Sequence, residues 1–428
     1  MTEFVPVSEV LSGSLTGKQV KLRGWVRAAR KQKEIVFLML RDGSGIMQVA
    51  VKEPALVKDA DKLTVESSIE LTGTVAEDKR APGGYEVRAT HLTTVAIAER
   101  WPIEHSKDKE LTDEFLRDIR HLWVRDPKMV AMLKVRSSVF QAIRKFYESR
   151  GYFEVQSPIF TTLGCEGGST LFEVKYGERK GVYLAQSWQL YAEAMVYGLE
   201  KIFTISPSFR AEKSRTIRHL SEYWHHEMET AWMDHEQLMG FEEDLIIFVT
   251  GYVLEHAEKE LKDLGRDTAG LKHLTKPFLR MTYKHAMDKL GKKHDDDITD
   301  KEERELLEKM GDRPMFLTSF SRDMKAFYMR PDPKDPKVVL ASDLLLPGVG
   351  EVIGGSERIF DGKELLESLK MFKLCKKDYE WYLDLTRFGA VPHSGFGLGI
   401  ERLLMWLTGA KHIFDTIPFP RSMDRVTP

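Results

Sequence analysis

Short strand-like runs separated by glycine-containing turns fill roughly the first hundred residues. Val, Ile, Leu and Thr enrich these runs: KQVKLRGWVRAA, IVFLMLRD, GIMQVAV, SSIELTGTVAE and YEVRATHLTTVAIA. The segments between them include Asp-Gly-Ser-Gly and Pro-Gly-Gly, which are typical of turns between strands. About five strands within about 100 residues predict a small closed barrel, and the OB-fold is the commonest such barrel that meets nucleic acid.

The rest of the chain follows a different pattern. Hydrophobic residues within 128–150 recur at helical spacing, among them Met132, Val135 and Tyr147, which predicts one long amphipathic helix. Strand-like runs such as VYLAQS, IFTISPSFR and KVVLASDLLL follow, separated by helical stretches but without regular strand–helix–strand units. This mixture predicts an α+β domain built around an antiparallel sheet.

These patterns divide the chain into three parts. We expect the barrel at 1–100, a charged linker at 101–127 and the α+β domain at 128–428. Residues 285–312 are highly charged, so we expect a solvated helical insertion there, to which the sequence assigns no function.

Composition excludes several classes of protein. The chain has no run of about 18 apolar residues and no basic, apolar leader, so we expect neither a membrane span nor a secretory signal. Its two cysteines, Cys165 and Cys375, are far apart in sequence, which excludes a disulfide framework and fits a reducing cytoplasm. The net charge is −2, but residues 18–42 carry eight basic and two acidic residues, so a local patch on the barrel can still attract nucleic acid.

Three segments carry most of the functional signal. In chain order they are RGYFEVQSPIF at 150–160, SFRAEKSRTIRHLSEYWHHEMETAW at 208–232 and GFGLGIERLLMWL at 395–407. The chain has no GxxxxGK[ST] phosphate loop, and GFGLG lacks the GxGxxG spacing. Together the three segments resemble motifs 1, 2 and 3 of the class II aminoacyl-tRNA synthetases, and the barrel before them resembles the aspartate, asparagine and lysine subgroup. The finer residues resemble the compact archaeal asparaginyl enzymes, over essentially the whole chain.

The resemblance implies an ATP site built mainly from arginines. Activation brings the amino-acid carboxylate to the α-phosphorus of ATP, so two anions must be held together, and guanidinium groups suit that task. Arg210 would hold the α-phosphate and Arg402 the γ-phosphate and adenine face, which makes them the candidate catalytic residues. Glu212 would accept from the adenine amino group, and Arg218 and His219 would touch the pyrophosphate. For the arginines, the alternative is a structural ion pair with a neighbouring glutamate.

The resemblance also implies a magnesium site. Glu351 and Asp343, in SDLLLPGVGEVIGGSER, match positions that hold Mg²⁺ on ATP in the family, and carboxylate oxygens suit that ion. Some relatives have a serine where this chain has Gly354, so the number of ions stays open. A structural role is the alternative for Asp343.

The amino-acid pocket has its own matches. CEGGSTLF resembles the mobile loop that closes over the amino acid, with Glu166 reaching the α-ammonium and Ser169 nearby. In QSWQLYAEA, Gln186 and Gln189 face the substrate in the family. Aspartyl enzymes have a lysine at the position of Ala192, where it grips the side-chain carboxylate, so this chain would lack that cation.

Two further matches favour a carboxamide substrate. Glu227 occupies a position that is aspartate in aspartyl enzymes and glutamate in asparaginyl ones, and Arg358 would hold the side-chain oxygen. A carboxylate accepts from an NH₂ group and a guanidinium donates to a carbonyl, whereas Glu227 would repel a bound carboxylate. Glu229 shares the strand face with Glu227, and its role stays open.

The barrel carries three residues that match anticodon contacts in the family. Phe37 would stack on a base, and Arg30 and Gln48 would hydrogen-bond to bases or phosphate, as in other single-strand binders. The alternative for Phe37 is a place in the barrel core, which we expect for Trp25.

The resemblance therefore implies a ligase that joins L-asparagine to tRNA(Asn), using ATP and Mg²⁺. Asparaginyl-adenylate would form first, and the tRNA 3′-OH would then attack it. We also expect a homodimer through motif 1 and a cytoplasmic location. Three alternatives stay open: an aspartyl-tRNA synthetase, against which Ala192 and Glu227 argue; a synthetase-like asparagine synthetase, which needs no barrel; and a non-catalytic RNA-binding paralogue, against which the intact Arg210, Glu351 and Arg402 argue.

Overall fold

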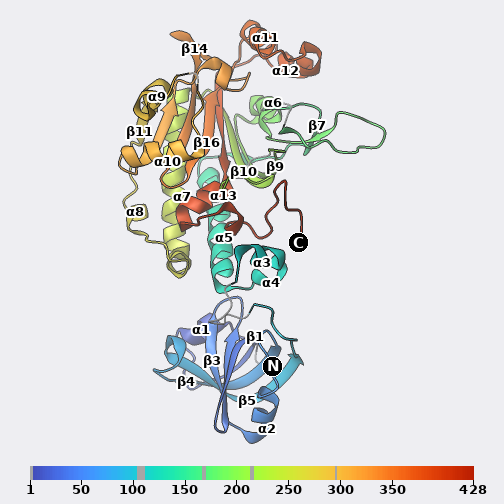
Figure 1. Cartoon of the computed structure of the whole chain (residues 1–428), viewed down its shortest axis with the longest axis vertical. Coiled ribbons are helices and arrows are strands. Elements are labelled where there is room, and N and C mark those ends of the chain that lie inside the picture. Colours follow the sequence, from blue (N-terminus) through green and yellow to red (C-terminus); the bar gives the residue numbers. More distant parts are fainter. Residues whose placement is uncertain (1–2, 104–110, 166–169, 213–215, 295) are drawn as a thin grey trace. The chain divides into compact units, whose positions relative to one another are not determined.

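The computed structural model describes residues 3–103, 111–165, 170–212, 216–294 and 296–428. The chain forms two compact units, Met1–Thr112 and Asp113–Pro428 (Figure 1). The segment at 101–127, which we expected to be a linker, therefore falls partly in each unit. Among the described residues, no helix has the length and apolar character needed to cross a membrane.

A closed barrel forms the N-terminal unit, with its strands joined in the order β1-β2-β3-β5-β4. Its elements are α1 (Val7–Leu11), β1 (Gln19–Gln32), β2 (Ile35–Arg41), β3 (Ile46–Val51), α2 (Pro54–Ala60), β4 (Ser68–Glu77) and β5 (Tyr85–Ala96). Burial alternates along β2, so that Val36, Leu38 and Leu40 point inward while Phe37 lies on the outer face. The prediction of a small OB-fold barrel is confirmed.

An eight-stranded sheet is the frame of the second unit, in the order β11-β12-β15-β16-β17-β10-β9-β6. Its strands are β6 (Phe153–Glu154), β9 (Lys201–Phe209), β10 (Glu222–Ala231), β11 (Leu279–Thr282), β12 (Met315–Thr318), β15 (Ala341–Leu346), β16 (Gly350–Glu357) and β17 (His393–Gly399). Two smaller sheets pair β7 (Phe160–Thr161) with β8 (Tyr183–Leu184) and β13 (Pro331–Asp332) with β14 (Asp335–Val339). The central strands are antiparallel to their neighbours, which confirms the predicted α+β class.

Local sequence determines where the long helices begin. Asp126 caps one of them by accepting from the Lys128 N–H, with Pro127 in the first turn, and Asp234 and Gln237 form a capping box at another. The helices are α3 (Asp113–Asp118), α4 (Arg120–Trp123), α5 (Pro127–Glu148), α6 (Gln189–Leu199), α7 (His235–Asp263), α8 (Ala269–Lys272), α9 (Tyr283–Leu290), α10 (Asp300–Lys309), α11 (Gly362–Met371), α12 (Glu380–Asp384) and α13 (Ile400–Thr408).

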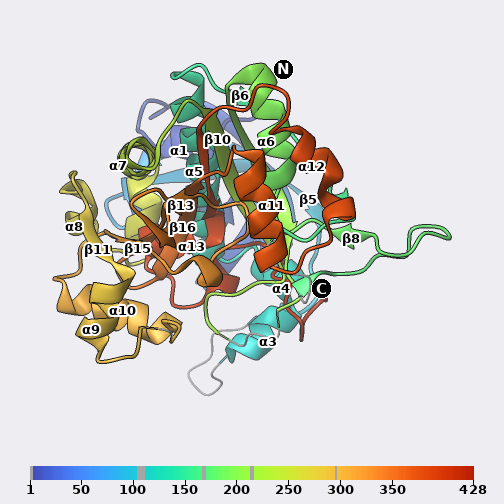
Figure 2. The same ribbon diagram turned by 90° about the horizontal axis from the view of Figure 1, so that it is seen from above.

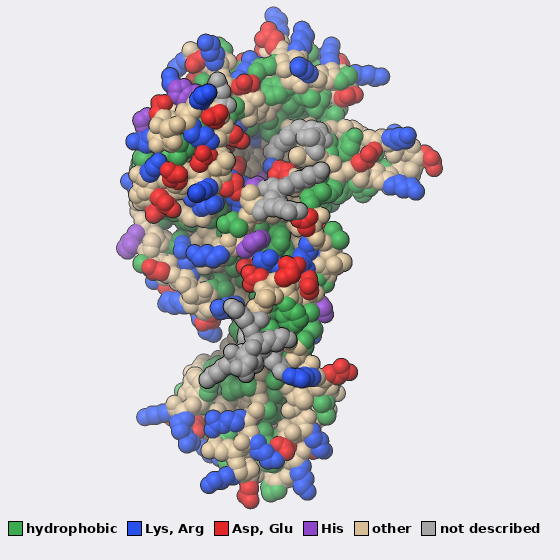
Figure 3. All heavy atoms as spheres, viewed as in Figure 1, with side chains coloured by type: hydrophobic (Ala, Val, Ile, Leu, Met, Phe, Trp, Pro, Cys, Tyr) green, Lys and Arg blue, Asp and Glu red, His purple; other side chains and the backbone are tan. Residues whose placement is uncertain are grey.

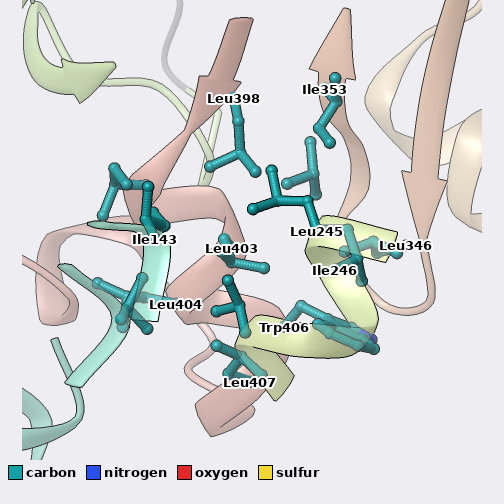
Figure 4. Packing of buried hydrophobic residues seen from close by; sticks show 14 of the residues in the cluster. Ile143, Leu245, Ile246, Leu346, Ile353, Leu398, Leu403, Leu404, Trp406 and Leu407 are labelled. Atoms are coloured by element: carbon teal, nitrogen blue, oxygen red, sulfur yellow. The ribbon is translucent and has the colours of Figure 1, made fainter. Parts of the chain in front are cut away.

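The main core lies where α5, α7 and α13 pack against the sheet (Figure 4). Ile143 from α5, Leu245 from α7 and Leu403 from α13 meet Ile353 and Leu398 from the strands, and all of these side chains are buried. Burying one such aliphatic side chain contributes about 1.5–3 kcal/mol. The core therefore fixes α13, which carries motif 3, against β16 and β17.

The charged segment 285–312 is solvated on one face only. Helices α9 and α10 lie side by side next to β11 in two perpendicular views (Figures 1 and 2). Met287, Leu306 and Leu307 are buried in a cluster with Leu345 of the large sheet, whereas Glu308 is exposed. The expectation of a solvated insertion is therefore wrong for the apolar face, which packs on the sheet.

Candidate active site

Paired residues on four adjacent strands form a row across the large sheet. Glu227 on β10 pairs with Gly397 on β17. Gly397 also pairs with Gly354 on β16, which in turn pairs with Asp343 on β15. Because neighbouring strands are about 4.8 Å apart, roughly 14 Å of sheet separates the two acidic residues. The row has a carboxylate residue at each end and glycine between them, so a ligand with two polar parts can lie along it.

A cavity of about 870 Å³ contains this row. The expected site residues that line it are Gln189, Arg210, Glu212, Arg218, His219, Glu227, Asp343, Glu351, Arg358 and Arg402. Gln186 is buried and is not among the described residues that line the cavity. It accepts from the Cys165 N–H at 3.3 Å and donates to Thr170 Oγ1 at 2.6 Å, so it bridges these two residues. Glu166 and Ser169 lie outside the described residues.

Cations from motifs 2 and 3 surround Glu351 at one end of the cavity. Arg402 Nη1 donates to Glu351 Oε2 at 3.0 Å, and Arg402 Nη2 lies 3.3 Å from His219 Nε2. Arg210 lines the same cavity, with its guanidinium 5.6 Å from the centroid of the Tyr223 ring. Burial opposes ionisation of Glu351, but Arg402 and the neighbouring cations prevail and lower its pKa to about 2. This concentration of positive charge suits a polyphosphate.

Arg218 lies in the structural arrangement that the sequence left open as an alternative. Its side chain is buried, with Nη2 2.7 Å from Asp300 Oδ1. Both Nη1 and Nη2 also donate to the Glu303 carboxylate. Arg218 thus pairs with acids from α10, while the neighbouring His219 faces Arg402.

Arg358 and Glu229 form a buried ion pair at the opposite end of the cavity. Arg358 Nε donates to Glu229 Oε1 and Nη2 donates to Glu229 Oε2, both at 3.1 Å. Nη2 also donates to Gln189 Oε1 at 2.6 Å, and Nη1 donates to Ser356 Oγ at 2.7 Å. From the sequence we expected Glu227 to be the acid that acts with Arg358. In the structure, Arg358 forms its direct ion pair with Glu229.

Glycine at position 395 explains this choice of partner. Gly395 on β17 pairs with Glu229 on β10 and with Ser356 on β16. A β-carbon on Gly395 would overlap the Glu229 carboxylate. Only glycine therefore leaves the space through which Glu229 reaches across β17 to Arg358.

Glu227 has its own set of donors. Its carboxylate accepts from Ser187 Oγ and, at 3.2 Å, from the Trp188 N–H. His225 Nδ1 lies 3.5 Å from Glu227 Oε2. Burial, together with the nearby Arg210, lowers the pKa of His225 well below its usual value, so this ring is neutral near pH 7. Glu227 therefore lines the cavity as an acceptor that neighbouring donors hold in place.

Two residues beside the row were not expected from the sequence. Lys325 Nζ donates to both oxygens of Asp343, at 2.7 and 2.6 Å. Lys325 lies in a segment without regular periodicity, so no local pattern marks it. Ser187 lies between the expected Gln186 and Gln189, just before α6. That position is the sequence feature that could have indicated it as a site residue.

The barrel brings its three expected residues onto one outer face. Arg30 on β1 pairs with Phe37 on β2, and Met39, which follows on the same face of β2, pairs with Gln48 on β3. Arg30 is exposed, and Phe37 is partly exposed rather than in the barrel core. Gln48 Nε2 donates to Glu86 Oε2 at 3.0 Å.

Trp25 lies on the barrel surface, which corrects the expectation that it is a core residue. Leu22 and Val26 point into the barrel, so alternation along β1 turns Trp25 outward, where it is 42% exposed. The Arg41 guanidinium lies 5.2 Å from the centroid of its ring. Lys and Arg side chains are spread over the visible face of the N-terminal unit (Figure 3). Aromatic rings among cations are typical of surfaces that bind single-stranded nucleic acid.

Comparison with known proteins identifies the family. Residues 112–423 match the class II tRNA synthetases of the D, K and N type, and residues 20–95 match the OB-fold nucleic acid binding domain. The asparagine–tRNA ligase of Thermoplasma acidophilum is 43% identical over an alignment of 436 positions, which covers 99% of this chain and 100% of the relative. The chain belongs to the asparagine–tRNA ligase family of class II synthetases.

Solved structures of this family have the same fold. The asparaginyl-tRNA synthetase from Pyrococcus horikoshii complexed with asparaginyl-adenylate superposes with a TM-score of 0.96 and 43% identity, covering 100% of both chains. The Entamoeba histolytica enzyme in complex with asparaginyl-adenylate gives a TM-score of 0.89 and 34% identity, covering 97% of this chain and 98% of that one.

Class II synthetases as a family use ATP with Mg²⁺, and the donor set around Glu351 and Asp343 fits the ion. A β-carbon built on Gly354 would lie 3.4 Å from Glu351 Oε1 and 3.5 Å from Asp343 Oδ1, so the two carboxylates approach one point. Proteins usually bind Mg²⁺ through one or two carboxylates, and water and phosphate oxygens complete the coordination shell. Burial raises the pKa of Asp343 to about 6 although Lys325 opposes the shift. The low pKa of Glu351 keeps this carboxylate ionised near neutral pH, the form that a metal ligand needs.

Proposed function

We propose that the protein is an asparagine–tRNA ligase that activates L-asparagine with ATP and transfers it to the terminal ribose of tRNA(Asn). We place this reaction in the cytoplasm. The observation that carries the proposal is the charge balance at the amino-acid end of the cavity. There, the cation expected to hold the substrate side chain is already paired with a buried carboxylate.

That balance favours an amide over a carboxylate. Arg358 is neutralised by Glu229, and Ala192 is buried among Trp188 and Val196 where aspartyl enzymes have a lysine. Glu227 then adds a negative charge that lines the cavity. An amide NH₂ can donate to Glu227 while its oxygen accepts from Arg358, whereas a carboxylate substrate would meet a net negative pocket.

The phosphate end supports the activation step. A carboxylate oxygen of asparagine forms a bond to the α-phosphorus of ATP, and the bond from that phosphorus to the bridging oxygen breaks, so that pyrophosphate leaves. Arg210 and Arg402 would neutralise the charge that develops on the phosphate oxygens, and they are held in place before the substrate arrives. Mg²⁺ held by Glu351, with Asp343 beside it, would add positive charge to the polyphosphate.

In the second step, the 3′-OH of tRNA attacks the carbonyl carbon of the adenylate and AMP leaves. Aminoacylation of tRNA(Asn) with labelled asparagine and labelled aspartate tests the whole reaction. Stable attachment of asparagine, with aspartate below about 1% of that rate, is the expected result, since a site built around a polar match rejects its isostere strongly. Attachment of aspartate at a similar rate would contradict the proposal.

We further propose that the outer face of the barrel reads the anticodon. Phe37→Ala is expected to lower kcat/KM for tRNA about 5- to 150-fold, because stacking of one base on an aromatic ring contributes about 1–3 kcal/mol. Activation of asparagine without tRNA should stay unchanged. Val95→Ala, which alters an exposed apolar residue elsewhere on the barrel, is the control and should behave as wild type. Equal loss in both variants would contradict a role for Phe37 in tRNA binding.

We also propose that motif 1 forms a two-fold dimer interface. Strand β6 is the outermost strand of the large sheet, and Phe153 on it is 54% exposed, with Ile159 at 43% and Phe160 at 48% nearby in sequence. An open sheet edge with apolar side chains is a surface that proteins cover.

Phe153→Asp is expected to separate the dimer into protomers of 49.2 kDa in analytical ultracentrifugation. The new carboxylate would lose its hydration in the apolar interface without a partner, which is costly. Phe388→Asp, at a position that is 80% exposed, is the control and should leave the dimer intact. A wild-type mass of one protomer at micromolar concentration would refute the dimer.

A further inference from the structure

Helix α10 brings acidic side chains of the charged segment 285–312 to the polyphosphate end of the cavity. A capping box fixes its first turn, since the Thr299 N–H donates to Glu302 Oε2 at 2.7 Å. Asp300 and Glu303 are three residues apart and so share one face of the helix. That face points at Arg218, and Glu303 is 8% exposed.

The Glu303 carboxylate holds two parts of the site at once. It accepts from Nη1 and Nη2 of Arg218, and Glu303 Oε2 also accepts from the backbone N–H of Glu351 at 2.9 Å. Glu351 is one of the two candidate magnesium ligands, and Arg218 belongs to motif 2. One buried carboxylate therefore joins motif 2 to the strand that carries the metal ligand.

Gly350 shows how closely these groups pack. Its φ is +92°, a conformation that favours glycine, and a β-carbon there would overlap both the Glu303 carboxylate and the Arg218 guanidinium. The start of β16 is thus shaped to let Glu303 reach the backbone of the next residue.

The contacts of Arg218 define its part in this arrangement. Asp300 and Glu303 both pair with it, and Arg218 Nη1 lies 3.4 Å from the Val349 carbonyl oxygen. A guanidinium that two carboxylates already neutralise is better placed to brace the site than to bind a phosphate. Arg218 still contributes to the lining of the cavity.

We propose that Glu303 is a positioning residue for the nucleotide: from α10 it holds Arg218 and the main chain at Glu351 in the geometry that receives ATP and its metal ion. The inference rests on the proposed function, because it assumes that ATP occupies this end of the cavity. It gives the charged segment 285–312 a role in catalysis that acts through motif 2 and β16.

The test is Glu303→Gln, with Glu308→Gln as a matched control on the exposed side of the same helix. A glutamine has one acceptor oxygen for three N–H donors, so it leaves buried donors unpaired. We expect the KM for ATP in asparagine-dependent exchange to rise roughly 10- to 100-fold, and the affinity for a non-hydrolysable ATP analogue measured by calorimetry to fall by a similar factor. The KM for asparagine should change less than about twofold, since the row places the two substrates at opposite ends.

The outcomes separate the two proposals. If wild-type protein activates no asparagine, the proposed function fails, and the calorimetric comparison of wild type with Glu303→Gln still decides the role of Glu303. Unchanged analogue affinity in a cooperatively folded Glu303→Gln variant would overturn the positioning role, as would equal rises in both KM values. If Glu303→Gln does not fold, Asp300→Asn, which removes one of the two ion pairs to Arg218, should weaken analogue binding about 3- to 10-fold. Wild-type affinity in that variant would overturn the inference.

Discussion

Replacing Arg210 with alanine is expected to lower the rate of asparagine-dependent ATP–pyrophosphate exchange by about 10²–10³-fold, the usual effect of removing one preorganised group that neutralises transition-state charge. Arg210 follows the last residue of β9, and its N–H donates to the Ser221 carbonyl at 2.9 Å, so the backbone that carries the guanidinium is fixed. The fixed backbone, together with the Tyr223 ring 5.6 Å from the guanidinium, limits the reorganisation needed when the α-phosphate gains negative charge. The loss should appear mainly in kcat, because the interaction strengthens as the transition state forms.

Two further variants define the origin of that effect. Arg210→Lys should recover only part of the rate, because an ammonium lacks the planar fork that grips two phosphate oxygens. Arg387→Ala removes an arginine whose partners Glu380 and Asp384 lie on the surface, and it should behave as wild type. A wild-type kcat for Arg210→Ala would mean that this guanidinium does not meet the reacting phosphate.

Replacing Glu227 with glutamine is expected to reduce the preference for asparagine over aspartate by at least about 100-fold in kcat/KM, since discrimination by a buried polar match reaches about 10⁴-fold. Glutamine removes the negative charge that repels an aspartate carboxylate, and its NH₂ can donate to that carboxylate. Asparagine should lose less, because the glutamine oxygen can still accept from its amide. Exchange rates with each amino acid, measured over a range of concentrations, give the two values of kcat/KM.

The control for this variant lies on the same strand. Glu222→Gln alters an exposed residue at the start of β10 and should leave the preference unchanged. An unchanged preference in Glu227→Gln would move the origin of specificity to the Arg358–Glu229 pair. Glu229→Gln would then test that pair, because it leaves the charge of Arg358 without its buried partner.

Sequence patterns predicted the parts of the fold that depend on local periodicity. The apolar run IVFLMLRD between turn residues predicted the barrel strand β2, and the helical spacing between Met132 and Tyr147 predicted α5. The capped start of α5 at Asp126 was equally local. Such features need only neighbouring residues, which is why the barrel and the order of the motifs were foreseen.

Features that depend on strand register were not accessible in the same way. Glu227 and Glu229 lie on one face of β10, and from the sequence alone we expected Glu227 to act with Arg358 and left the role of Glu229 open. The answer depends on Gly395, which is distant in sequence and leaves the space that Glu229 needs. The glycines of motif 3 are evident in the sequence, but the structural reason for them appears only when β10, β16 and β17 lie side by side.

Contacts between residues far apart in sequence could not be predicted for the same reason. The pairing of Arg218 with Glu303 joins motif 2 to a helix whose composition suggested a solvated surface. A finer pattern was present, since Glu303 lies one turn before the buried Leu306 and Leu307 and therefore on the inner face of α10. Lys325 had no such signal, because it lies outside regular structure and meets Asp343 only in the folded chain.

ATP–pyrophosphate exchange with asparagine and aspartate in parallel, without tRNA, is the decisive experiment for amide selectivity. It reports adenylate formation alone, and so isolates the end of the cavity that Glu227 and Arg358 line, with Glu229 paired to Arg358. We expect rapid exchange with asparagine and, with aspartate, exchange slower by about 10²-fold or more. Exchange with aspartate at the same rate or faster would contradict an amide-selective pocket, and the absence of exchange with either amino acid would contradict the proposed activation step.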